Sequence, residues 1–399
     1  MAWKEVEPME ERIRFVIMAS REDDVFSNLC REFGISRKTG YKWLNRYEEY
    51  GLAGMHELSR RPLNSPNRVE DWIESLIVRE RRRHRSWGPK KLREVVADNY
   101  ELERMPAEST IGNIIKRHGL TRKKKRRSKV MKPSRETLTK ATRPNEVWAA
   151  DFKGWFRTKD GQRCDPLTIS DLYSRYVLGC RIVAGQKIES VMPVFRNVFI
   201  KKGMPEVIRV DNGSPFGSRG VCGLSKLSAC WLNLGITVEF IEPGHPEQNG
   251  KHERMHRTLK DETARPPAAT PKAQQRRFDR WRREFNHDRP HEAIGMQKPA
   301  QRYQCSSRRY TGSPQPPSYP LHYEVRKVKT HGAIKWKNQF YYVGEALHGM
   351  ALGLIDIADG QYEVYFNDLL LGCLNEQNTG GLRPPVSAPQ YSPDQGAKV

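Results

Sequence analysis

The chain has 399 residues, a length that at about 150 residues per domain predicts several domains. Lysine and arginine number 70 against 47 aspartates and glutamates, so the formal charge is +23. A field of this sign attracts polyanions, first of all nucleic acid or an anionic membrane. The sequence lacks a run of about 18 uncharged apolar residues and a secretory leader, so neither an integral membrane protein nor a secreted one is expected.

The cysteines agree with an intracellular protein. There are seven, an odd number, and no two of them stand at CxxC spacing. This pattern predicts reduced thiols rather than a disulfide framework or a zinc cluster. We therefore expect a cytoplasmic protein.

Residues 1–60 are predicted to form a helix-turn-helix domain. Three short helices are expected, and Gly34 and Ser36 supply the turn and the N-cap before the third, Arg37–Tyr50. The first helix is expected to bury an apolar stripe made of Ile13, Val16 and Ile17. The third carries the cations that a recognition helix brings into a major groove, namely Arg37, Lys38, Lys42 and Arg46. The alternative is a helical bundle with a solvated basic face.

Two further segments extend this basic region. Residues 67–120 are expected to form a second helix-turn-helix-like domain with helices at Val69–Arg83, Pro89–Tyr100 and Glu108–His118. Residues 121–143 are a basic linker with six consecutive cations, namely Arg122, Lys123, Lys124, Lys125, Arg126 and Arg127. Like charges repel, so this linker is expected to be extended and to follow DNA phosphates, unless it is only a solvated spacer.

Residues 144–265 change to an α/β pattern. Three consecutive strands are followed by alternating helices and strands, the order of a ribonuclease-H-like domain; the strands are expected at Glu146–Phe156, Leu167–Ile169, Tyr176–Val183, Val207–Val210 and Ile236–Ile241. A post-core helical segment is expected over 266–305, a small β-barrel over 320–376 and a disordered tail over 377–399. The fold class is therefore multidomain.

Three acidic residues stand out in apolar surroundings. Asp151 lies within a buried strand and Asp211 ends another, where α/β sheets place ligands. Gly213 permits a sharp turn beside a substrate backbone. Glu253 lies on a predicted helix with Arg257 and Lys260 on the same face, and Lys251 and Arg254 also lie on this helix. This pattern suits a divalent metal beside a phosphodiester, and we expect all four cations to contact DNA phosphates, the alternative being solvated helix charges.

These residues carry a family resemblance that covers nearly the whole chain. The matching motifs are Trp148 to Phe152, Ser170 to Arg175, Asp211 to Gly213, Pro243 to Lys260, Arg289 to His291 and Lys298 to Tyr303. In order and spacing they resemble insertion-sequence transposases with a retroviral-integrase-type core. The resemblance implies that Asp151, Asp211 and Glu253 are the catalytic, metal-binding Asp-Asp-Glu triad.

Two features qualify the resemblance. The N-terminal His/His/Cys/Cys zinc module of retroviral integrases has no counterpart here, so the helix-turn-helix domains are expected to replace it. Glu247 is a rival for the third ligand, although it precedes Gly250 whereas the acid of the family follows that glycine. Asp171 is another candidate, unless it is a cap or pairs with Arg175.

The chemistry implied is a Mg²⁺-dependent polynucleotidyl transfer, with Mn²⁺ as a substitute. Two metals activate the attacking oxygen and stabilise the leaving one, first for 3′-end cleavage and then for strand transfer. Asp151 is expected to bridge both metals. The partners would be double-stranded DNA at transposon ends and target, bound by a homodimer or homotetramer associated with a bacterial nucleoid.

Two other functions were weighed. His252 to His256 matches HExxH, the helix motif of zinc peptidases, but that function leaves Asp151 and Asp211 unexplained. A non-catalytic, domesticated DNA-binding regulator would use the helix-turn-helix domains alone. The intact triad argues against it.

Overall fold

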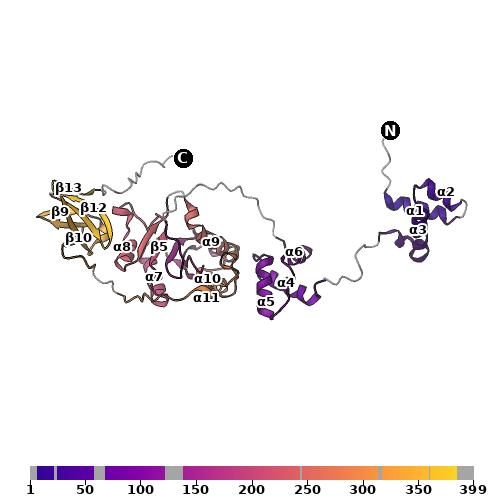
Figure 1. The fold of residues 1–399 in the computed structure, drawn as a ribbon, viewed down its shortest axis with the longest axis horizontal. Coiled ribbons are helices and arrows are strands. Elements are labelled where there is room, and N and C mark those ends of the chain that lie inside the picture. The colour runs from indigo at the N-terminus through magenta and orange to yellow at the C-terminus, as the bar shows by residue number, and fades with distance from the viewer. Residues whose placement is uncertain are drawn as a thin grey trace, which may run out of the picture. The chain divides into compact units, whose positions relative to one another are not determined.

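The computed structural model describes residues 7–21, 25–57, 68–121, 138–242, 245–312, 317–358 and 360–383 (Figure 1). The chain divides into two compact units, Met1–Val69 and Glu70–Val399. The basic segment 122–132, expected to follow phosphates, lies outside the described residues. No helix in the described part of the chain is long and apolar enough to cross a membrane.

The first unit contains the three predicted helices. They are α1 (Pro8–Ala19), α2 (Phe26–Glu32) and α3 (Arg37–Tyr50). Gly34 takes the left-handed conformation at φ +64°, and the Ser36 hydroxyl accepts a hydrogen bond from the Thr39 amide at 3.2 Å. The turn and the N-cap therefore form as the sequence predicts.

The core of this unit differs from the predicted stripe at one position. Val16 is buried and Ile13 packs against the core, but Ile17 is 40% exposed and Phe15 is buried in its place. Each residue turns a helix by about 100°, so Ile17 lies beyond the inward-facing sector that Phe15 and Val16 share. The prediction for Ile17 was wrong.

Gly40 lies where α3 packs tightly against the other two helices. A Cβ atom at this position would lie 2.7 Å from Cys30 Sγ and 3.0 Å from ring carbons of Phe15 and Phe26. Overpacking of this kind costs about 1–3 kcal/mol. We expect Gly40→Ala to reduce the hydrogen-exchange protection of residues 8–55 by that amount. Gly112→Ala is the matched helical control, because its Cβ would meet only Pro89 at 3.7 Å; equal protection losses in the two variants would contradict the prediction.

The second unit begins with the other predicted helical module. It consists of α4 (Asp71–Arg83), α5 (Pro89–Tyr100) and α6 (Glu108–Arg117). Pro89 occupies the first turn of α5, where its missing amide proton costs no hydrogen bond. The core of the module includes buried side chains from each helix, among them Ile77, Leu92, Val96, Ile111 and Ile114.

The α/β domain is built on a mixed sheet. Its strands are β1 (Val147–Phe152), β2 (Phe156–Arg157), β3 (Arg163–Asp171), β4 (Val177–Val183), β5 (Val207–Val210) and β6 (Thr237–Phe240). The order is β4-β3-β1-β5-β6, with β2 on an extension of β3. β1, β3 and β4 are antiparallel neighbours, whereas β5 and β6 are parallel to β1. The single strand predicted over Glu146–Phe156 is divided at residues 153–155, where Gly154 has φ +82°.

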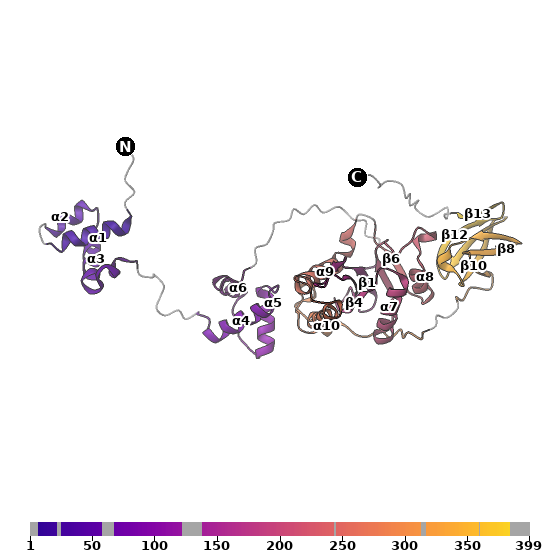
Figure 2. The same cartoon turned by 180° about the vertical axis from the view of Figure 1, so that it is seen from behind.

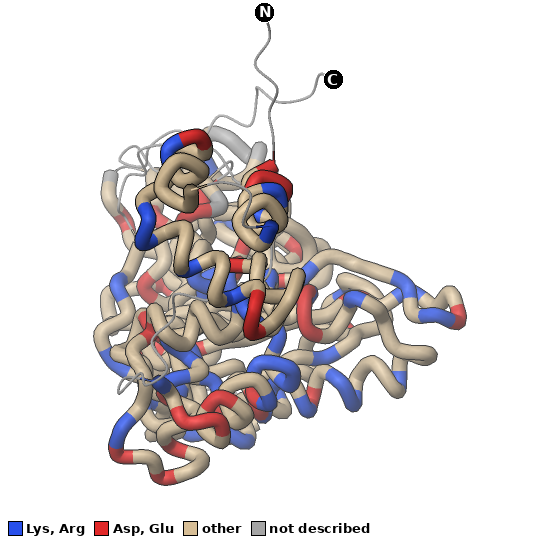
Figure 3. Tube along the Cα trace, turned by 90° about the vertical axis from the view of Figure 1, so that its right-hand side faces the viewer, with Lys and Arg blue, Asp and Glu red and all other residues tan. Residues whose placement is uncertain are grey.

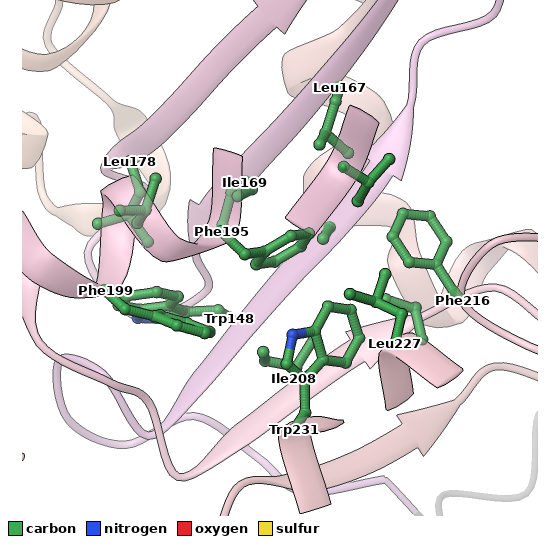
Figure 4. Packing of buried hydrophobic residues seen from close by; sticks show 14 of the residues in the cluster. Trp148, Leu167, Ile169, Leu178, Phe195, Phe199, Ile208, Phe216, Leu227 and Trp231 are labelled. Carbon is green, nitrogen blue, oxygen red and sulfur yellow. The ribbon is translucent and has the colours of Figure 1, made fainter. Parts of the chain in front are cut away.

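Helices cover both faces of this sheet. They are α7 (Ile188–Lys202), α8 (Lys226–Asn233), α9 (Gly250–Thr263) and α10 (Pro271–His287), followed by the short α11 (Pro299–Arg302). α7 and α8 bury Phe195 and Trp231 against strand residues such as Trp148 and Ile208 (Figure 4). α9 and α10 pack a second apolar cluster against β4, which includes Met255, Leu259, Phe278 and Trp281. The result is a helix–sheet–helix sandwich.

The C-terminal β-rich part forms an open sheet. Its strands are β7 (Glu324–Lys327), β8 (Ala333–Trp336), β9 (Gln339–Tyr342), β10 (Ala351–Ala358), β11 (Gln361–Phe366), β12 (Leu369–Asn375) and β13 (Asn378–Arg383) (Figure 2). Five pair in the order β13-β12-β11-β10-β7, and β8 pairs only with β9. Among the described residues the ladder does not close, so the predicted barrel is not confirmed. β13 also occupies the start of the segment 377–399 that was predicted to be disordered.

Candidate active site

The two aspartates meet because of the parallel pairing of β1 with β5. Val147 is opposite Val207 and Ala149 is opposite Arg209. Continued by two residues, this register brings Asp151 beside Asp211, which directly follows β5. The Gly213 amide donates to Asp211 Oδ1 at 3.2 Å, and a Cβ at Gly213 would lie 3.3 Å from Asp211 Oδ2. A glycine here keeps the space beside that carboxylate open.

Helix α9 is held against the sheet by two buried histidines. Nε2 of His252 and Nε2 of His256 lie 2.7 Å and 2.6 Å from the Thr168 hydroxyl on β3. That hydroxyl also donates to the Asp151 carbonyl at 3.1 Å. The neighbouring Glu253 is exposed and borders the same hollow as Asp151. The histidines therefore fix the helix that carries the third acid.

The hydrogen bonds define the protonation of these histidines. Thr168 gives its single proton to the Asp151 carbonyl, so it accepts from Nε2 of both rings. His252 Nδ1 is 2.7 Å from the Ser170 hydroxyl and accepts from it. Burial lowers the pKa of His252 to about 3 and holds the pKa of His256 well below its usual value, so both are neutral.

This arrangement disfavours the zinc-peptidase alternative. Both ring nitrogens of His252 are engaged with β3, and both histidines are buried while Glu253 faces outward. A peptidase site requires both histidines to converge on one metal beside the glutamate. Within the described ranges, no group of three or more His, Cys, Asp or Glu side chains is already arranged to hold a metal ion.

Burial and a neighbouring acid dominate the environment of the Asp151 carboxyl, although the charge of Lys153 offsets part of their effect on its pKa. Burial first, and then the negative charge of Asp211, raises the pKa of Asp151 to about 7. Burial also raises the pKa of Asp211. In the tautomer described above, His256 Nδ1 carries a lone pair and no proton, and it lies 3.6 Å from Asp151 Oδ2. A proton or a cation fits this group of acceptors, and a divalent cation suits the carboxylate oxygens.

This pKa predicts an effect of pH on stability. The unfolded Asp pKa is about 3.9, so the raised folded pKa contributes stability that is complete below pH 4. It is lost as the pH rises through about 7. In metal-free buffer at pH 8, Asp151→Asn is expected to raise the melting temperature of the core by roughly 3–10 °C, and at pH 4 by almost nothing. Asp288→Asn, at an exposed position, is the control, and equal shifts at the two pH values in Asp151→Asn would refute the prediction.

The two rival acids have other partners. Asp171 is buried, and its carboxyl accepts hydrogen bonds from the Asn145 amide at 2.8 Å and the Ser174 amide at 2.7 Å. It is therefore a cap of the β3–β4 turn. Glu247 Oε1 lies 2.7 Å from His245 Nδ1, in the loop before α9.

Cations surround the hollow that contains Asp151 and Glu253. Arg257 and Lys260 line it as the helix spacing predicts, and Lys153 lines it as well. Sequence reasoning missed Lys153, although the period of two in a strand puts residues 151 and 153 on one face. Burial and the charge of Lys260 lower the pKa of Lys153. Lys251 lines a second hollow, and Arg254 borders both.

The predicted recognition helix has an aromatic centre that sequence reasoning also missed. Trp43 is buried on α3, and the side chains of Arg12, Lys42 and Arg46 lie over its ring at 4.2, 4.6 and 5.0 Å from the centroid. Arg37 and Lys38 are exposed. In the view of Figure 3, lysines and arginines are interspersed with acidic residues over the visible part of the chain.

Known families match most of these parts. Residues 141–246 and 234–299 each match a family described as an integrase core domain. Residues 11–62 match a helix-turn-helix domain and residues 39–115 a homeodomain-like domain. The chain is thus similar to integrase core domains over these residues, and the segments before them are similar to helix-turn-helix and homeodomain-like domains.

Individual relatives show a more specific similarity, to proteins of insertion elements. The insertion element IS476 uncharacterized 39.2 kDa protein of Xanthomonas euvesicatoria is 26% identical over 251 residues, which are 63% of this chain and 70% of that protein. The insertion element IS407 uncharacterized 31.7 kDa protein of Burkholderia multivorans is 25% identical over 238 residues, 59% of this chain and 82% of that protein. Among solved structures, the HTLV-2 integrase catalytic core domain in complex with magnesium has 14% identity and a TM-score of 0.34, covering 41% of this chain and all of that one. The two insertion-element relatives and the domain matches confirm the resemblance to insertion-sequence transposases.

Proposed function

We propose that this chain is a DNA transposase that cuts at transposon ends and joins the freed 3′ ends to target DNA. The observation that supports this proposal most strongly is that Asp151 at the end of β1 lies beside Asp211 at the end of β5, and that Glu253 lies on the neighbouring helix α9. Asp151 and Glu253 line one cationic hollow, and Asp211 follows β5 beside Asp151; carboxylates grouped among cations suit a divalent metal and a phosphodiester together.

Each residue has a distinct task in this proposal. Asp151, Asp211 and Glu253 would hold Mg²⁺, which supplies charge stabilisation for the attacking and leaving oxygens when bound. Lys153, Arg257 and Lys260 line the same hollow and bind phosphate oxygens beside the reacting bond. His252 and His256 act on β3 and keep α9 in place.

The helix-turn-helix domains would recognise the DNA. The exposed Arg37 and Lys38 begin α3, and a recognition helix contacts bases through its N-terminal residues. Lys42 and Arg46, which pack on Trp43, would bind the flanking backbone. Two ends must be paired for insertion, so at least two copies of the chain act together.

A plasmid strand-transfer assay tests the proposal. Wild-type protein, duplex carrying the ends of the element and supercoiled plasmid are expected to give joined products in Mg²⁺ or Mn²⁺, and none in EDTA. A chain that binds the end duplex but joins nothing under any of these conditions would be a DNA-binding regulator instead. The assay thus separates the two functions.

A further inference from the structure

A second positively charged hollow lies beside a different face of α9. Arg175, from the turn between β3 and β4, lines it together with Lys251 and Arg254 of α9. With about 100° per residue, Lys251, Arg254 and Thr258 share one helix face, whereas Glu253, Arg257 and Lys260 share another. Gly250 and Arg254 border both hollows, so the two are neighbours along α9.

Three cations of this hollow lack partners, whereas Arg289, which also lines it, pairs with Glu262. None of the side chains of Arg175, Lys251 and Arg254 forms an ion pair or a hydrogen bond with any residue that the structure describes. The buried Nε of Arg175 has no acceptor among the described residues. Buried donors are almost always paired, so this N–H points to an absent acceptor.

The charges in the hollow are also unbalanced. Burial lowers the pKa of Arg175, and the charge of Arg254 lowers it further. The acids that line the hollow are Asp171, Glu247 and Glu292, fewer than its lysines and arginines, and the Asp171 carboxyl already accepts hydrogen bonds from the amides of Asn145 and Ser174. An anion from outside the chain would therefore relieve mutual repulsion.

The backbone supports a functional origin for this cluster. Arg175 has φ +68°, in the left-handed region that a non-glycine residue adopts at a cost of about 1 kcal/mol or more. The Arg175 amide donates to the Asp171 carbonyl at 3.0 Å and closes the turn. The turn thus places the guanidinium of Arg175 in the hollow, although a residue type that favours the left-handed region would adopt this backbone conformation at a lower cost.

We propose that Arg175, Lys251 and Arg254 form a second phosphate site, which binds a non-reacting phosphodiester of the DNA strand whose reacting phosphodiester lies at Asp151, Asp211 and Glu253. This inference rests on the proposed function and adds the path of the strand along α9. The shared border at Gly250 and Arg254 favours a continuous strand over a free anion. Such a contact fixes the position of the strand without reading its sequence.

The test uses the full chain and a 30-base-pair duplex of arbitrary sequence in EDTA, so that binding is separated from catalysis. The affinity is measured against NaCl concentration for wild type and for Arg175→Gln/Lys251→Gln. The logarithmic salt slope is expected to fall by about 1–2, since each lost phosphate contact removes about 0.9. Lys201→Gln/Arg309→Gln removes two exposed cations outside both hollows and is expected to change the slope much less.

The possible outcomes distinguish a failure of the proposed function from a failure of the second phosphate site alone. Failure of the wild type to bind any duplex would overturn the proposed function. Normal binding with an unchanged slope in the double variant would overturn only the second phosphate site. If inorganic phosphate raises the melting temperature of wild type but not of the variant while the slope stays the same, the site binds a free anion and the assignment to DNA is wrong. Should the double variant unfold, Lys251→Gln alone, at an exposed position, is expected to lower the slope by about 0.9.

Discussion

Asp151→Asn, Asp211→Asn and Glu253→Gln, tested singly, are each expected to lower the rate of strand joining in Mg²⁺ by at least about 100-fold. Loss of a group that merely orients a metal ligand already costs 10–100-fold, and these three groups would be the ligands themselves. Each substitution keeps the shape of the side chain and removes its charge. The rate is measured by single-turnover joining of a labelled end duplex to plasmid.

Asp171→Asn and Glu247→Gln are the matched controls, since both replace acids close to the site in sequence or space. Glu247→Gln is expected to stay within about threefold of wild type, because its carboxylate pairs with His245. Asp171→Asn is expected to act through stability, because its carboxyl caps a turn. A loss in Glu247→Gln as large as that in Glu253→Gln would show that the third ligand has been misassigned.

Trp231→Ala is expected to destabilise the core by about 3–5 kcal/mol, the largest effect on folding that we predict. Trp231 is fully buried, and its ring lies 4.7 Å from that of Phe195 and 6.2 Å from that of Phe216. The loss is one of packing alone, because its indole nitrogen has no hydrogen-bond partner among the described residues. The melting temperature of the core should fall by roughly 6–20 °C, measured by differential scanning calorimetry.

Trp155→Ala is the control for this variant. Trp155 belongs to the same domain but is 56% exposed, between β1 and β2. Surface substitutions of this kind usually change stability by less than about 0.5 kcal/mol. Equal losses in the two tryptophan variants would contradict the packing shown in Figure 4.

Much of the fold follows from local patterns. The helices of both helical modules begin and end close to their predicted residues, because Ser36, Gly34 and Pro89 act within one turn of themselves. The strand ends at Asp151 and Asp211 were also predictable, since acids after apolar runs are conspicuous in a basic chain. Their closeness follows from the parallel pairing of β1 with β5.

Other features depend on contacts between distant parts of the chain. His252 and His256 contact Thr168, which lies more than 80 positions away in the sequence. From the sequence alone, the same two histidines also matched the HExxH motif, which has a different interpretation. The open C-terminal sheet differs from a barrel only in whether the edge strands meet, and alternation within strands is the same for both. The left-handed Arg175 was unpredictable because that conformation is rare outside glycine and asparagine.

The central claim is that the carboxylates of Asp151, Asp211 and Glu253 hold the metal used in strand transfer. Its most direct test is Asp211→Cys, assayed for strand joining in Mg²⁺ and in Mn²⁺. A thiolate is a poor ligand for Mg²⁺ and a better one for Mn²⁺. We predict activity at least about 100-fold below wild type in Mg²⁺ and at least a tenfold recovery in Mn²⁺, with no such recovery in Asp211→Ala. Near-normal joining by Asp211→Cys in Mg²⁺, or equal recovery of both variants in Mn²⁺, would show that Asp211 is not a metal ligand.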